Sequence, residues 1–77
     1  MTSVLERVRQ VVSDVFAVPL ERVDANSSPD TIEAWDSMQH LNLVLAVEDK
    51  FNLQFTPEEM ELMRSVTQIV TVVESRR

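Results

Sequence analysis

The 77-residue chain contains no cysteine and no glycine, and each absence excludes a class of site. Without cysteine there is no disulfide, no zinc–thiolate site and no cysteine nucleophile, so any thiol chemistry needs an imported thiol. The usual Walker loop and the dinucleotide fingerprint are also excluded, because both use glycine to bring the backbone close to phosphate. The sequence therefore argues against a nucleotide-binding enzyme.

Positive charge is scarce, with 7 lysine and arginine residues against 13 acids and a net charge of -6. Nucleic acids and anionic membranes would repel such a chain, so neither is an expected partner, whereas a basic protein surface is. No apolar run approaches the length of a membrane span, and the N-terminal residues lack the layout of a signal peptide. We therefore expect a cytoplasmic monomer.

Apolar residues make up 44 % of the chain and recur at three- and four-residue spacing, which predicts one helical domain over residues 1–77. Start signals and periodicity predict helices at residues of about 3–16, 37–51, 57–63 and 65–74. Each start pairs a capping residue with Glu or Gln three positions later: Ser3 with Glu6, Asp36 with Gln39, Thr56 with Glu59, and Ser65 with Gln68. The expected fold class is all-α, a small antiparallel four-helix bundle with a long loop after the first helix and a short third helix.

The segment 17–36 is predicted to be irregular, because Pro19 and Pro29 interrupt it. A connection this long in a small domain is expected to be functional or held in place. Val23, Ile32 and Trp35 are the candidates to hold it. Trp35 could instead face a partner or a bound group, but a lone tryptophan in a loop is more often a packing anchor, and we adopt that interpretation.

The run Trp35-Asp36-Ser37-Met38 places a serine hydroxyl in the first turn of the second helix, with Asp36 as the expected N-cap. Unpaired N–H groups and the helix dipole would favour a phosphate on Ser37 by roughly 0.3–1 kcal/mol. This position suits a phosphorylated or phosphopantetheinylated serine. The alternative is an ordinary exposed residue at a helix start, where serine is common.

The second helix has more apolar residues than one buried face requires. With Leu43, Val44, Val47 and Phe51 toward the core, one side that begins beside Ser37 carries a stripe of three apolar residues: Met38, Leu41 and Leu45. An exposed apolar stripe suggests a docking surface, whereas complete burial in a tight bundle is the alternative.

Further along, five acids accompany the single base Lys50 between residues 48 and 61, namely Glu48, Asp49, Glu58, Glu59 and Glu61. This surface could steer a basic partner, or it could be ordinary solvated helix polarity. His40 is the only histidine, so no metal site is expected. Three residues along one helix cannot build a Ser-His-Asp relay, so we predict no catalytic residues and simple exposure of His40.

The whole pattern resembles the acyl carrier protein family. It comprises an amphipathic first helix, a long loop, Asp36-Ser37-Met38 opening an apolar helix that ends Glu48-Asp49-Lys50-Phe51, and Thr56-Pro57-Glu58-Glu59 before a short final helix. The resemblance implies that a phosphopantetheinyl transferase attaches 4′-phosphopantetheine from coenzyme A to the serine matching Ser37. The terminal thiol then carries acyl or aminoacyl groups as thioesters. The chain would be a carrier and not an enzyme.

By the same resemblance, Asp36 would help the transferase to recognise the site, and Met38, Leu41, Leu45 and Glu48 match the family's recognition helix. Fatty-acid carriers usually have a glycine shortly before the Asp-Ser pair and acids in the first turns of this helix, where the present chain has Gln39 and Asn42. A specialised carrier is therefore expected, serving polyketide or nonribosomal peptide synthesis or a dedicated acyl or aminoacyl ligase. Its partners would be activating ligases, synthases or acyltransferases. The alternative is an unmodified helical adaptor that docks through the second helix.

Overall fold

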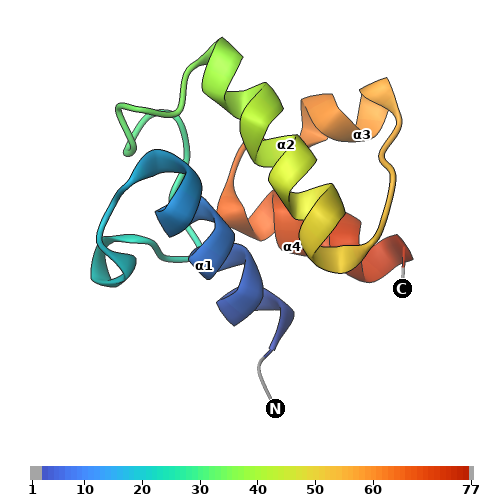
Figure 1. Ribbon diagram of the computed structural model, residues 1–77, viewed down its shortest axis with the longest axis horizontal. Coiled ribbons are helices and arrows are strands. Elements are labelled where there is room, and N and C mark those ends of the chain that lie inside the picture. Colours follow the sequence, from blue (N-terminus) through green and yellow to red (C-terminus); the bar gives the residue numbers. More distant parts are fainter. Residues whose placement is uncertain (1–2, 77) are drawn as a thin grey trace.

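The computed structural model describes residues 3–76, which form four α-helices and one turn of 3-10 helix (Figure 1). The elements in chain order are α1 (Val4–Phe16), η1 (Leu20–Arg22), α2 (Ser37–Phe51), α3 (Pro57–Leu62) and α4 (Val66–Arg76). The predicted helices are confirmed, although α3 ends one residue earlier and α4 two residues later than expected. The turn η1 was not predicted.

Side-chain caps set the helix starts, but only one predicted capping box is complete. At α3, Thr56 accepts a hydrogen bond from the Glu59 N–H (3.2 Å) and the Glu59 carboxylate accepts one from the Thr56 N–H (2.9 Å). In the other three, the third-position side chain bonds elsewhere, Glu6 to Arg9, Gln39 to Asn42 and Gln68 to the Arg64 N–H. Those predicted boxes are therefore only half formed.

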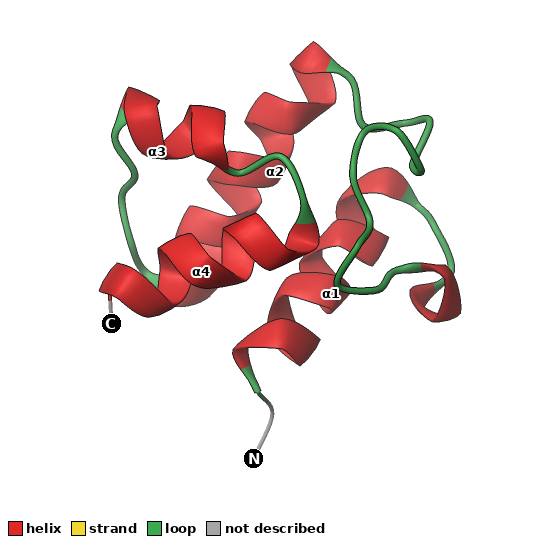
Figure 2. Cartoon of the chain, turned by 180° about the vertical axis from the view of Figure 1, so that it is seen from behind, coloured by secondary structure: helices red, strands yellow, loops and turns green. Residues whose placement is uncertain are grey.

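The helices enclose one apolar core. Figure 1 shows α1 and α2 running in opposite directions, and Figure 2 shows α4 on the other side of the bundle, at an angle to both. α1 packs against α2 and α4, and the short α3 packs on α4. This arrangement confirms the predicted all-α bundle. Within residues 3–76, no helix is long and apolar enough to cross a membrane.

The long loop between α1 and α2 is held in place by buried side chains, as predicted. Val23, Ile32 and Trp35 are all buried in the core. The loop also hydrogen-bonds to the start of α4, where the Val66 N–H donates to the Ser27 carbonyl at 2.9 Å. The segment that precedes α2 is therefore part of the packed structure, which fixes where α2 begins.

Glu59 and Arg76 join the start of α3 to the end of α4 through an ion pair of 3.0 Å. The hydrogen bond from the Thr56 N–H is the main cause that lowers the pKa of the Glu59 carboxyl below its ordinary 4.5; desolvation opposes it, and the Arg76 charge adds to the lowering. A lowered pKa in the folded state stabilises the fold above pH 4.5, and this contribution is lost as the pH falls through the lowered value.

Glu59→Gln is therefore expected to make the free energy of unfolding less dependent on pH below pH 4.5. Below pH 4.5, the wild type should lose stability faster than the variant, whereas at pH 7 the variant should be the less stable of the two. Urea denaturation at several pH values measures both. The exposed Glu58→Gln is the matched control on the same turn. Parallel curves for wild type and Glu59→Gln would contradict the assignment.

Candidate functional site

The start of α2 is fixed by hydrogen bonds on both sides of Ser37. Asp36 is the N-cap, with an extended backbone (φ -102°, ψ -175°), and its Oδ1 accepts from the Gln39 N–H at 2.9 Å. The Asp36 carbonyl accepts from the His40 N–H at 2.8 Å. The predicted cap is confirmed, and it leaves Ser37 as the first residue of the helix, with its side chain exposed.

The Ser37 hydroxyl differs from the other serine and threonine hydroxyls in residues 3–76, because it alone has no hydrogen-bond partner. The others cap helices, close turns or bond to carbonyls, as do those of Ser3, Ser13, Ser27, Ser28, Thr31, Thr56, Ser65, Thr67, Thr71 and Ser75. Ser37 therefore contributes an exposed hydroxyl at a helix N-terminus, where the dipole and the free N–H groups favour an attached anion.

Behind Ser37, Trp35 is buried as the predicted anchor, with 2 % of its surface exposed. Its ring packs on Phe16, with 5.4 Å between centroids. Its Nε1–H donates to His40 Nδ1 at 3.0 Å, so that nitrogen is the acceptor and the neutral ring carries its proton on Nε2. Nε2 lies 2.9 Å from the Met60 carbonyl and donates to it.

The prediction that His40 is simply exposed is wrong. It is half-buried, and it ties the loop to α3 through Trp35 and Met60. The helical periodicity could not reveal this, because Met60 lies 20 residues away in sequence. Both ring nitrogens are occupied, so neither is free to take a proton from Ser37. Within residues 3–76, no group of acids or histidine could hold a metal ion.

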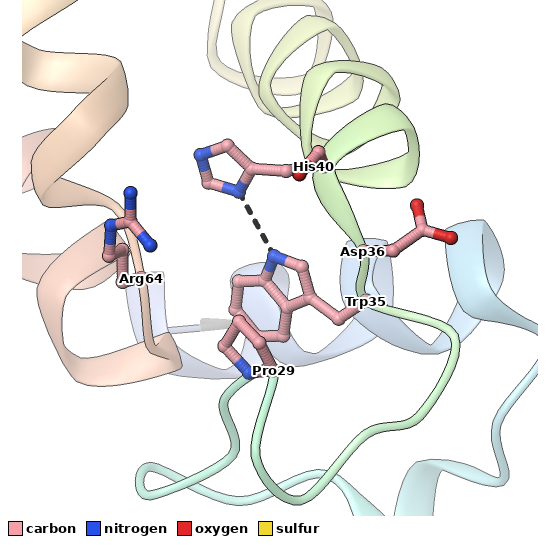
Figure 3. Close-up of a pocket in the computed structure, with 6 residues that line it drawn as sticks. Pro29, Trp35, Asp36, His40 and Arg64 are labelled. Carbon is pink, nitrogen blue, oxygen red and sulfur yellow. Dashed lines mark hydrogen bonds between the residues drawn. The ribbon is translucent and has the colours of Figure 1, made fainter.

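A pocket of about 390 Å³ opens beside Ser37 (Figure 3). Its lining comes from the loop, the first turn of α2 and the turn between α3 and α4, and comprises Pro29, Trp35, Asp36, Ser37, His40 and Arg64. Figure 3 shows Arg64 on the opposite side of the pocket from Asp36. Sequence reasoning missed Pro29 and Arg64, since only the fold brings them to Ser37.

The predicted apolar stripe on α2 is exposed. Met38, Leu41 and Leu45 have 81 %, 55 % and 53 % of their surface accessible. On the other side of the helix, Leu43, Val44 and Val47 are completely buried, as expected, while Phe51 is half-buried against the core. The stripe begins next to Ser37, so the exposed hydroxyl and an apolar surface share one side of the molecule.

Two of the five acids predicted to form a negative surface instead accept hydrogen bonds from backbone N–H groups. Glu48 Oε2 accepts from the Phe55 N–H at 2.7 Å, and Glu59 caps α3. Asp49, Glu58 and Glu61 are exposed. The first turn of α2 contains no acid, and the carboxylate next to Ser37 is that of the N-cap Asp36.

Comparison with known proteins agrees with this geometry. The family model for the phosphopantetheine attachment site matches residues 6–73. An acyl carrier protein of Akkermansia muciniphila is 31 % identical over 72 residues, covering 94 % of this chain and 90 % of the relative. Acyl carrier protein 3 of Ralstonia nicotianae is 26 % identical over 73 residues, covering 95 % of this chain and 84 % of the relative.

Proposed function

Because this chain belongs to the acyl carrier protein family, whose members carry covalent 4′-phosphopantetheine and are not enzymes, we propose that Ser37 bears this group. One observation carries the proposal: among residues 3–76, Ser37 has the only serine or threonine hydroxyl that is free of hydrogen bonds. This hydroxyl is exposed at the start of α2. Exposure matters because attack on the pyrophosphate of coenzyme A needs an accessible oxygen. Asp36 completes the transferase recognition site.

The arm on Ser37 shuttles acyl or aminoacyl thioesters between enzymes. Family members interact with phosphopantetheinyl transferases, synthases and other transferases. A covalent arm raises the concentration of its thioester at each docked active site, without any tight complex. Residues 1–77 form one carrier domain, which works in the cytoplasm as a monomer.

A specialised pathway fits this chain better than housekeeping fatty acid synthesis. The first turn of α2 has no acid, and Gln39 and Asn42 bond to each other there. A docking helix without acids in its first turn favours a partner that recognises shape and apolar contact beside Ser37. Polyketide and nonribosomal peptide synthases, dedicated acyl or aminoacyl ligases and acyltransferases are the proposed partners.

Partners dock on the stripe of Met38, Leu41 and Leu45, with Glu48 at its far end. Asp49, Glu58 and Glu61 steer basic surfaces toward it. The exposure of three large apolar side chains in a row supports this surface, because scattered apolar residues are normal but contiguous ones mark interaction sites.

Leu41→Asp is expected to weaken docking of the phosphopantetheinyl transferase. Burying a carboxylate in an apolar contact should lower kcat/KM by about 10-fold or more, with the loss mainly in KM. Leu62→Asp is the matched control, because Leu62 is equally exposed (58 %) but lies on α3. Equal losses in both variants would place docking elsewhere.

Intact mass after incubation with coenzyme A and a broad-specificity phosphopantetheinyl transferase tests the proposal as a whole. The expected result is a gain of one phosphopantetheine. The unmodified adaptor is the competing function, because the exposed stripe alone could bind a partner. No gain from folded protein, together with partner binding that survives Ser37→Ala, would favour the adaptor.

A further inference from the structure

The pocket beside Ser37 contains one unused cationic group. Arg64 Nε donates to the Glu61 carbonyl at 3.2 Å, whereas its two Nη groups have no hydrogen-bond or ion-pair partner among residues 3–76. The other side-chain donors of the lining are occupied, because Trp35 Nε1–H bonds to His40 and His40 Nε2–H bonds to Met60. Apart from Ser37 itself, Arg64 is therefore the side chain of this pocket that can still donate to an anion.

Arginine suits a phosphate in this position. Its guanidinium is permanently charged, and its planar fork can donate two parallel hydrogen bonds to phosphate oxygens. A phosphodiester on Ser37 adds one negative charge next to the exposed Asp36 carboxylate, which repels it. Arg64 lies across the pocket from Asp36 and would offset this repulsion (Figure 3).

The shape of the pocket fits the beginning of an organic arm. Its volume of about 390 Å³ lies within the range of about 300–1,000 Å³ that is usual for small-molecule sites. Pro29 and Trp35 provide apolar lining next to His40. A chain that leaves a phosphate held by Arg64 would therefore meet an apolar surface.

We infer that Arg64 is a positioning residue for the prosthetic arm, which binds the phosphodiester on Ser37 and lays the adjoining pantoyl segment against Pro29, Trp35 and His40. This inference rests on the proposed attachment to Ser37. Arg64 has no part in attaching the arm. Its effect is to restrict the directions in which the arm leaves α2.

Two resonances of the holo-protein report on this site without any enzyme assay. The first is the ³¹P signal of the phosphodiester, and the second is the indole N–H signal of Trp35, the only tryptophan of the chain. In the wild type, conversion from apo to holo should move the indole signal. In Arg64→Gln this movement should be largely lost and the ³¹P signal should shift toward that of free phosphopantetheine. Arg64→Lys, which keeps the charge without the fork, should lie between the two.

Arg22→Gln is the matched control, because it removes one exposed arginine from another pocket and should behave as the wild type. A salt titration of the wild-type holo-protein needs no variant, and it should move the ³¹P signal toward its position in Arg64→Gln. Identical ³¹P and indole signals in wild type and Arg64→Gln, or a ³¹P signal unaffected by salt, would overturn the inference. Absence of any phosphopantetheine on the wild type would instead overturn the proposed function.

Discussion

Ser37→Ala is expected to abolish uptake of phosphopantetheine without disturbing the fold. The hydroxyl is the proposed nucleophile toward coenzyme A, and it makes no hydrogen bond whose loss could destabilise the protein. Alanine is the better helix former by roughly 0.5 kcal/mol, so the thermal midpoint should stay the same or rise slightly. Intact mass after transferase treatment measures the uptake, and circular dichroism measures the fold.

Ser28→Ala provides the matched control for this variant. Ser28 lies in the loop just before α2, and its hydroxyl accepts from the Asp30 N–H at 3.2 Å. This variant should gain the full mass of one phosphopantetheine. Residual modification of Ser37→Ala at the wild-type rate would show that another hydroxyl accepts the group.

Trp35→Ala is expected to remove most of the stability of the domain. Truncating a buried tryptophan costs about 3–5 kcal/mol, and a single core of this size supplies roughly 3–5 kcal/mol in total. The change also removes the ring that packs on Phe16 and the donor that orients His40. Urea denaturation followed by circular dichroism should show a protein that is largely unfolded at 25 °C.

Trp35→Phe separates the two roles of the tryptophan. It retains an aromatic ring beside Phe16 but leaves His40 Nδ1 without its donor, which should cost about 1–3 kcal/mol. A cooperative transition at lower urea is therefore expected for this variant. Wild-type stability of Trp35→Ala would contradict the role of the loop as part of the core.

The predictions for Ser37 and Trp35 are connected, because the loop that contains Trp35 positions Ser37. Trp35 and His40 connect the loop, α2 and α3 directly behind Ser37. A serine on a helix start held in this way presents its hydroxyl, and later its arm, in one direction relative to the stripe of Met38, Leu41 and Leu45. Residual modification of a destabilised Trp35 variant should therefore fall with the fraction that remains folded.

Features that depend on local sequence could be predicted. The start of α2 follows from Asp36 and the apolar periodicity, and the exposed stripe follows from an excess of apolar residues on one helix. The burial of Trp35 follows from the need to hold a long loop. Each of these signals lies in the same helix or loop as the feature that it predicts.

Features that depend on the fold could not be predicted. His40 was expected to be exposed, and nothing in the local sequence points to its partner on α3, which lies 20 residues away. Glu48 reaches forward to the Phe55 N–H, which no helical spacing indicates. Arg64 reaches the pocket of Ser37 only because the fold brings the turn between α3 and α4 against the loop that precedes α2, so neither charge count nor motif could connect the two residues.

Fragmentation of the modified peptide tests the central claim most directly. The tryptic peptide 23–50 of the wild-type holo-protein contains Ser37 together with Ser27, Ser28 and Thr31. The added phosphopantetheine is expected on Ser37 in every modified molecule. Phosphopantetheine on Ser27, Ser28 or Thr31, or its absence from this peptide, would contradict it.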